Sequence, residues 1–401
     1  MEDPEHRLGE FLEKIRADLD RSVCFWLTHS HDVQCGGFFI CLGEDGHVYD
    51  ETKYTWLEAR QVWMYARLYN EVDRFKTAEM LEAAENGGKF VLAHMKRQDT
   101  GKCYLSLTRQ GLPLKTQRTI FSECFYLMAM SELHRATGDA QYREEAVAMM
   151  SRILCWVLED DSGLGREKLA GNTPVSSLAV PMMLLCLIDQ LTTMDPALAA
   201  NYDETEQWCL EEVNKHVQRN GTVVLENVTP DGKELPGSAG RLMTPGHAIE
   251  AGWFLLQIAK TKGDKTLQTL AIDTFITTSF SRGWDPEFGG LFYFVDADGE
   301  SPVQLEWDMK LWWAHNETMI AMLMAYTETG DTKLLANFAT VFDYSYSHFV
   351  DTAHGDWYGY LNRRGEITHK FKGGPWKGFF HLPRCLMMCE KMLEDLIKRK
   401  Q

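Results

Sequence analysis

Apolar residues recur every three or four positions in a series of stretches spread along the whole chain. This spacing places them on one face of a helix, so each stretch predicts a helix with a buried side. The clearest stretches are residues 56–69, 120–133, 180–191, 248–258, 319–326 and 382–393. The pattern therefore predicts a mostly helical protein.

Several of these helices end on the same signal, a glycine followed by an aspartate. It occurs at residues 137–139, 262–264 and 329–331. Glycine can end a helix in the left-handed conformation, and the aspartate can cap the helix that follows. We therefore expect the helices to come in antiparallel pairs.

A recurrent short segment lies between the helix pairs. It opens on aspartate or asparagine, contains a short apolar run and closes on glycine. Copies occupy residues 32–46, 99–111, 220–232, 285–299 and 351–365, and a degenerate copy lies at residues 161–166. Their starts are 59 to 67 residues apart, which predicts a repeat of two helices and a small hairpin.

Six helix pairs can form an open superhelix or close into a barrel. Ionisable residues occur at the starts of alternate helices, and only closure would let them converge. We therefore expect an all-α fold, an (α/α)6 barrel of six repeats with short β-hairpins at one end. No linker, low-complexity tract or shift in composition divides the chain, so we interpret residues 1–401 as a single domain.

Composition and charge exclude some classes of partner. The formal charge is −17, which disfavours nucleic acids and anionic membranes. The acidic N-terminal stretch does not resemble a signal peptide, and the longest apolar run, near residues 180–188, is too short to cross a bilayer. Several of the ten cysteines lie in apolar helical runs, as reduced buried thiols do, so we expect a cytoplasmic protein.

Charged residues share one register at the starts of the predicted inner helices. Arg60, Glu123, Glu250, Glu317 and Arg384 occupy equivalent positions, and three residues earlier stand Leu57, Ile120, His247, Ala314 and His381. Acidic residues there can be simple partners of the helix dipole, but arginine at a helix start opposes the dipole. The set therefore indicates a site where the helix starts meet.

His247 and His381 are the strongest candidates for chemistry. They lie two repeats apart, and Thr244 and Pro245 are suited to cap and start the helix that carries His247. A helix start disfavours imidazolium, which keeps an imidazole ready to accept a proton. A structural role would be the ordinary reading of either histidine alone, but their shared register favours a pair that moves protons.

Other chemistries fit the residues less well. Paired carboxylates such as Glu250 and Glu317 could serve glycoside hydrolysis, which has no need of two histidines. No phosphate-binding glycine loop or serine-hydrolase elbow occurs. Two sets of residues could hold a metal, but neither has a strong ligand spacing, and we expect none: His247, Glu250, His315 and Glu317, and His29, His31 and Asp32.

Tryptophans gather near the same helix starts. Sugars stack their C–H faces on such rings, although core packing accounts for some of them. The residues are Trp56, Trp63, Trp253, Trp307, Trp312, Trp313 and Trp376.

Four long motifs resemble the N-acylglucosamine 2-epimerase (renin-binding protein) family. They are T-K-Y-T-W-L-E-A-R-Q-V-W, P-G-H-A-I-E-A-G-W, L-E-W-D-M-K-L-W-W-A-H-N-E and K-G-G-P-W-K-G-F-F-H-L-P-R-C-L. The resemblance runs the whole length of the chain. It implies an (α/α)6 barrel and interconversion of N-acetylglucosamine and N-acetylmannosamine.

The resemblance also implies roles for residues and partners. His247 and His381 would be the catalytic pair, and the sugar site would be lined by Arg60, Glu250, Glu317 and Arg384. It implies a homodimer and stimulation by ATP or another nucleotide that is not consumed, at a site that no motif locates. The alternatives are a related aldose or disaccharide 2-epimerase or isomerase, and an inhibitory protein that binds renin.

Overall fold

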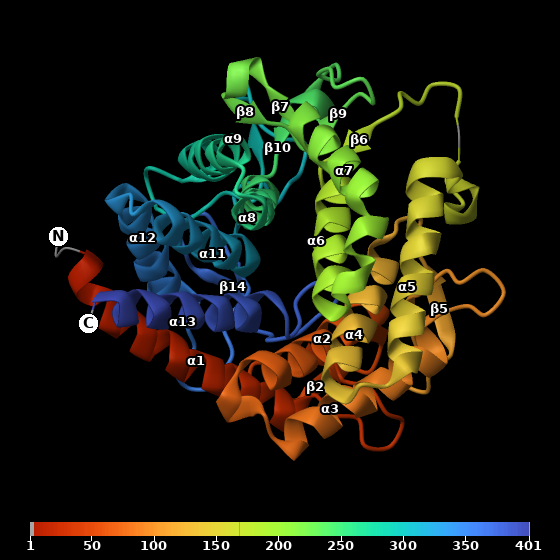
Figure 1. The fold of residues 1–401 in the computed structure, drawn as a ribbon. Coiled ribbons are helices and arrows are strands. Elements are labelled where there is room, and N and C mark those ends of the chain that lie inside the picture. Colours follow the sequence, from red (N-terminus) through yellow and green to blue (C-terminus); the bar gives the residue numbers. More distant parts are fainter. Residues whose placement is uncertain (1–3, 168, 401) are drawn as a thin grey trace.

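Two concentric rings of helices make up the fold in the computed structural model, which describes residues 4–167 and 169–400 (Figure 1). The inner helices contact one another in chain order, and the last returns to the first, which closes the ring. They are α2 (Thr55–Glu71), α4 (Phe121–Thr137), α6 (Ala179–Met194), α8 (Pro245–Lys262), α11 (Trp312–Thr329) and α13 (His381–Lys400). The predicted (α/α)6 barrel is confirmed.

Each inner helix packs against an outer helix. The outer ring consists of α1 (Leu8–His29), α3 (Ala78–Phe90), α5 (Ala140–Leu154), α7 (Asp203–Lys215), the continuous run α9 (Lys265–Thr269), η9 (Leu270–Thr278) and α10 (Ser279–Gly283), and α12 (Thr332–His348). The first outer helix, α1, packs against the last inner helix, α13, so the two ends of the chain meet. Lys400 and Glu5 form an ion pair there at 2.7 Å.

Short helical segments complete the connections. They are η1 (Pro4–Arg7), η2 (Asp73–Phe75), η3 (Val91–Met95), η4 (Cys155–Glu159), η5 (Asp161–Leu164), η6 (Pro196–Asn201), η7 (Arg219–Gly221) and η8 (Ser238–Arg241). No helix in the described ranges is long and apolar enough to cross a membrane.

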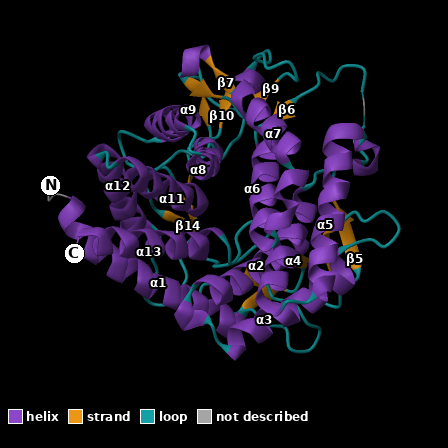
Figure 2. Cartoon of the chain, in the orientation of Figure 1, coloured by secondary structure: helices purple, strands orange, loops and turns teal. Residues whose placement is uncertain are grey.

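The strands are short and antiparallel, and they link neighbouring repeats (Figure 2). The sheets are β1 (Cys41–Leu42) with β2 (Val48–Asp50); β3 (Lys53–Tyr54), β4 (Tyr104–Leu107) and β5 (Pro113–Thr116); β6 (Ser176–Ser177) with β9 (Asn227–Val228); β7 (Val217–Gln218) with β8 (Val223–Val224); β10 (Leu242–Met243) with β11 (Val295–Asp296); and β12 (Lys310–Leu311), β13 (Tyr360–Leu361) and β14 (Ile367–His369).

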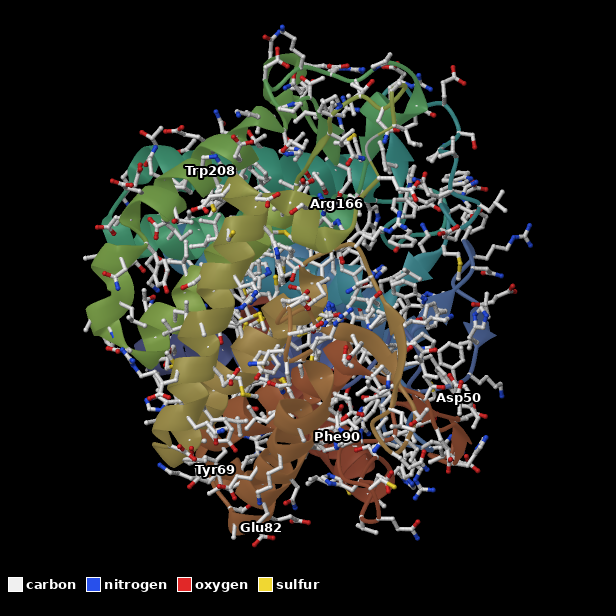
Figure 3. All side chains as sticks on the ribbon, turned by 90° about the vertical axis from the view of Figure 1, so that its right-hand side faces the viewer. Asp50, Tyr69, Glu82, Phe90, Arg166 and Trp208 are labelled. Carbon is white, nitrogen blue, oxygen red and sulfur yellow. The ribbon has the colours of Figure 1, made fainter. Side chains whose placement is uncertain are left out.

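These strands lie at the end of the barrel where the inner helices begin. In Figure 3, Asp50 of β2 is on one side of the molecule and Tyr69, near the end of α2, is on the other. Strands β3, β10 and β12 lead directly into α2, α8 and α11. The hairpins thus surround the helix starts where the candidate residues lie.

The predicted helix ends are confirmed. Gly138, Gly263 and Gly330 end their helices in the left-handed conformation, and an aspartate caps each following helix. Pro245 is the first residue of α8 and Thr244 is at the capping position, as expected. The expected bond from the Thr244 hydroxyl to the helix is absent, so that detail was wrong.

A buried aspartate–lysine pair anchors several hairpins to the helix that follows. Asp285 accepts hydrogen bonds from the backbone of its own turn, at Glu287 and Phe288, and its other oxygen accepts one from Lys310 at 3.0 Å. Burial lowers the pKa of Lys310 to about 8. Equivalent pairs join Asp32 to Lys53 and Asp351 to Lys372. This repeated contact orients the strand that enters an inner helix, and so positions the start of that helix.

Candidate active site

The starts of four inner helices bring the sequence-predicted residues together at the hairpin end of the barrel. Arg60 comes from α2, His247 and Glu250 from α8, Glu317 from α11, and His381 and Arg384 from α13. Apart from His247, which is partly exposed, all of them are buried.

Glu317 is the centre of the bonded group. Its side chain is fully buried, and its Oε1 accepts from His381 Nδ1 at 2.7 Å and from Arg384 Nη2 at 2.6 Å. Its other oxygen accepts from Trp253 Nε1 at 2.9 Å. The same Arg384 nitrogen donates to Glu250 at 2.7 Å. Because Nδ1 of His381 donates to a carboxylate, its Nε2 is left free to accept a proton.

The environment keeps His381 neutral. Burial lowers its pKa well below the usual range, and the positive charges of Arg60 and Arg384 add to this effect. The Glu317 carboxylate does not reverse this lowering of the pKa, because Arg384 already balances its charge. His381 is therefore suited to act as a base.

His247 has the opposite electrostatic environment. Its Nδ1 lies 3.1 Å from Oε2 of Glu226, a residue of the hairpin segment before α8. Burial alone would lower the pKa of His247, but the carboxylates around it, Glu226 first and then Glu250 and Glu317, together raise that pKa. Burial opposes ionisation of Glu226 too, and His247 outweighs it and lowers the pKa of Glu226. His247 is therefore suited to act as an acid.

Trp313 connects the two histidines. Its ring centre lies 5.1 Å from that of His247 and 5.8 Å from that of His381. Both imidazoles therefore contact the same ring, and their centres can be no farther apart than the sum of these two distances.

Arg60 is held by aromatic rings rather than by carboxylates. Its guanidinium carbon lies 4.8 Å from the ring centre of Trp56, 4.0 Å from that of Phe125 and 4.8 Å from that of Phe380. Burial lowers its pKa to about 9, so the group remains charged at neutral pH. Within the described residues, Arg60 forms no ion pair or hydrogen bond, and its Nε is buried without a partner. It is available to a ligand.

Two residues considered with this set serve the hairpins instead. Glu123, which shares the register of Glu250, binds Lys102 and the backbone N–H of Cys103. His315 accepts a bond from the backbone of Leu291 through Nε2, and its Nδ1 lies 2.6 Å from the Leu311 carbonyl. Neither therefore belongs to the site, and the metal set that included His315 is not assembled.

The remaining predicted residues divide between the site and its surroundings. Trp312 lies beside His381, and Trp376, which is 67% exposed, packs edge-on against Trp56 at the rim. Trp307 packs on Phe292 in a hairpin segment. The second metal set is structural as well: Asp32 pairs with Lys53, His31 lies 3.3 Å from the Tyr65 hydroxyl, and the His29 ring packs on Phe25.

Glu226 is the important residue that sequence reasoning missed. It follows the apolar run Val223–Leu225, which lies in the core, and its own side chain is only 11% exposed beside His247. Nothing in the sequence indicates which base it meets.

Glu250, Glu317 and His381 also form a group whose ligand atoms lie within 4.8 Å of one another, close enough to bind a metal ion. However, Arg384 binds both carboxylates and supplies the positive charge at this position. An ion would have to displace that guanidinium.

Comparison with known proteins relates the chain to sugar epimerases. The family model described as N-acylglucosamine 2-epimerase (GlcNAc 2-epimerase) matches residues 37–385. N-acylglucosamine 2-epimerase of Bos taurus is 54% identical over all of this chain and 95% of that protein, and the Homo sapiens protein of that name is 53% identical over all of this chain and 94% of its own length. Among solved structures, cellobiose 2-epimerase from Spirochaeta thermophila has a TM-score of 0.81 at 20% identity, covering 99% of this chain and 100% of that one.

Proposed function

This chain belongs to the N-acylglucosamine 2-epimerase family, and we propose that it interconverts N-acetylglucosamine and N-acetylmannosamine. The observation that carries the proposal is the pair of histidines that contact one ring, Trp313, each with a carboxylate next to Nδ1. The cellobiose 2-epimerase of Bacteroides fragilis is 24% identical to this chain, so the comparisons favour the amino sugar over a disaccharide.

The reaction exchanges a proton at C2 of the open-chain sugar. The C1 aldehyde acidifies C2, so a base can remove its proton and leave a planar enolate. An acid on the opposite face then returns a proton, which inverts C2. We assign the base to His381 and the acid to His247 for one direction; the reverse direction starts from the exchanged protonation states.

Carboxylates position the two imidazoles. Glu317 accepts from Nδ1 of His381 and is itself held by Trp253 and Arg384, so we propose it as a positioning residue. Glu226 has the same relation to His247 and in addition favours the charged form of that ring.

Arg60 is the group we assign to the developing negative charge on O1. Its guanidinium has no carboxylate partner, whereas Arg384 is bound to Glu250 and Glu317. A preoriented cation in a water-poor site stabilises an enolate oxygen without having to reorganise. The remaining surface of Glu250 and the rings of Trp56 and Trp313 would contact the rest of the sugar.

Glycoside hydrolysis is disfavoured by the same bonds. It needs one carboxylic acid that donates a proton to the leaving group. Glu250 and Glu317 both accept hydrogen bonds from Arg384, where that reaction needs a carboxyl group that donates.

Several further properties rest on the family resemblance alone. We propose stimulation by ATP or another nucleotide that is not consumed, assembly as a homodimer and a cytoplasmic location. Binding to renin is the least supported of these properties, and no residue is assigned to it.

The decisive experiment supplies the purified protein with N-acetylmannosamine, with and without ATP, and follows N-acetylglucosamine by chromatography. Conversion in both directions to one equilibrium ratio is the expected result. Cellobiose and D-mannose are tested as alternative substrates. Conversion of either of them, with no turnover of the amino sugars, would overturn the assignment.

A further inference from the structure

A cavity of about 800 Å³ lies at the opposite end of the barrel from the hairpins, between the C-terminal halves of the inner helices. We call it the distal chamber. Its inner end is formed by Trp63, Trp253 and Arg384, and it extends past Gln190 and Gln257 to the ends of α2 and α13. The catalytic assignments above use none of it beyond Trp253 and Arg384.

Part of the chamber wall is apolar and adaptable. Five methionines from three inner helices line it, together with Leu185, Phe254 and Ile258. Methionine side chains are flexible and polarisable, and surfaces rich in them accommodate ligands of varied shape. The methionines are Met128, Met324, Met387, Met388 and Met392.

A few polar atoms on the wall are left free. Asp189 accepts from Gln257 through Oδ1 at 3.1 Å, and its Oδ2 has no hydrogen bond within the described residues. Gln190 accepts from Trp63 at 2.8 Å and from Arg67 at 3.2 Å, and its amide N–H groups donate no hydrogen bond within the described ranges. Burial raises the pKa of Asp189. The inner part of the lining is mainly apolar with these few polar groups, which is the usual form of a small-molecule site, whereas the rim toward the ends of α2 and α13 carries most of the charged residues.

The basic side chains of the lining are already paired with carboxylates. Arg67 binds Glu132, Arg384 binds Glu250 and Glu317, and the other basic residues bind acids nearby: Arg16 to Glu390, Arg74 to Glu390, Lys391 to Glu71 and Lys398 to Glu394. An anionic ligand would find the arginines already paired and only the exposed Lys391 and Lys398 loosely held. It would also face the rim acids Asp73 and Asp395, which form no ion pair within the described residues.

We propose that the distal chamber binds an uncharged small molecule with an apolar body and a hydrogen-bonding end, and that its occupant acts on the catalytic end. The polar end would meet Asp189, Gln190 and Gln257. The body would contact Trp253, whose Nε1 holds Glu317 behind His381. Only this second part rests on the proposed epimerase function.

The test uses two dyes that differ in one group. N-phenyl-1-naphthylamine is uncharged with a single N–H, and 8-anilinonaphthalene-1-sulfonate has the same skeleton with a sulfonate. Fluorescence titration of the full chain should show saturable binding of the uncharged dye, at least about tenfold tighter than the sulfonate, which corresponds to about 1.4 kcal/mol. Equal or tighter binding of the sulfonate would overturn the charge argument.

Variants locate the site. The double variant Met324→Trp, Met388→Trp narrows the chamber. It should lower the affinity for the uncharged dye at least about tenfold. Leu305→Trp, which adds the same indole at a position that is 95% exposed, should leave the affinity unchanged. If the double variant does not fold, methionine-methyl NMR of the unmodified chain replaces it. Shifts confined to methionines outside the chamber would overturn the location.

The effect on catalysis is measured separately. Saturating uncharged dye should change the rate of amino-sugar epimerisation by at least about twofold, and the double variant should lose this response. Binding with no change in rate would overturn the action on the catalytic end while the site stands. If the protein epimerises no amino sugar, the proposed function fails and the binding titration still decides the site.

Discussion

Nδ1 of His381 lies 2.7 Å from Oε1 of Glu317, the oxygen that also accepts a hydrogen bond from Arg384. The carboxylate thus orients the imidazole while the arginine balances its charge. His381 gains a fixed tautomer without becoming protonated. His247 differs, because its partner Glu226 has no arginine bond in the part of the chain that the structure describes, and it raises the pKa of that histidine.

Removing either histidine should abolish net epimerisation. We expect His247→Ala and His381→Ala each to lose about 10²–10⁴-fold in kcat, since each removes one proton-transfer group. In heavy water, the His247→Ala variant should still replace the C2 proton with deuterium in the epimer that His381 deprotonates. It should not invert the configuration at C2. Proton NMR of the recovered sugar measures both outcomes. Inversion at more than about a tenth of the wild-type rate would remove that histidine from the mechanism.

Replacing Glu226 should shift the descending limb of the profile of kcat/KM against pH. Glu226→Gln keeps the shape but loses a charge that helps to raise the pKa of His247, so that pKa should fall. Where His247 is the acid, activity is present below its pKa and is lost as pH rises through it. The descending limb of kcat/KM against pH should therefore move to lower pH.

The matched control for this change is Glu234→Gln in the same hairpin segment. Glu234 pairs with Arg219 on the surface and should leave the profile unchanged. An unchanged limb in Glu226→Gln would show that Glu226 does not set the protonation state of His247.

Arg60 should matter mainly to the transition state. Arg60→Ala should lower kcat by about 10²–10³-fold, the effect of losing one oxyanion donor. Arg60→Lys should recover little, because lysine cannot reproduce a planar group stacked on Trp56 and Phe125. Steady-state kinetics separate kcat from KM, and Arg97→Ala, which removes a surface partner of Asp99, is the control. A rise in KM alone would reassign Arg60 to simple sugar binding.

A further buried aspartate–lysine anchor joins the hairpin segment 351–365 to the residues just before α13, and it should contribute strongly to the free energy of unfolding. Lys377, four residues before His381, is fully buried and pairs with Asp356 at 2.6 Å. Asp356→Asn leaves that ammonium without a carboxylate, so the free energy of unfolding should fall by about 3–5 kcal/mol. Denaturant titration measures it, and Asp231→Asn, at an exposed ion pair with Lys233, should change it little. A small effect at Asp356 would show that the anchor is dispensable.

The sequence by itself determined the architecture, because its signals are local or periodic. The left-handed glycines at residues 138, 263 and 330 act within one helix turn, so they could be read without the fold. The repeat spacing places His247 and His381 at equivalent helix starts, which is why their pairing was predictable.

The tertiary structure alone decided the chemical character of these positions. Glu123 and Glu250 share a register, yet a hairpin binds Glu123 while Arg384 binds Glu250. His247 and His381 also share a register, yet one gains a carboxylate from a hairpin and the other gains two guanidinium groups from α2 and α13. A pKa depends on burial and on charges brought close by the fold, and no periodicity of the chain encodes which charge arrives.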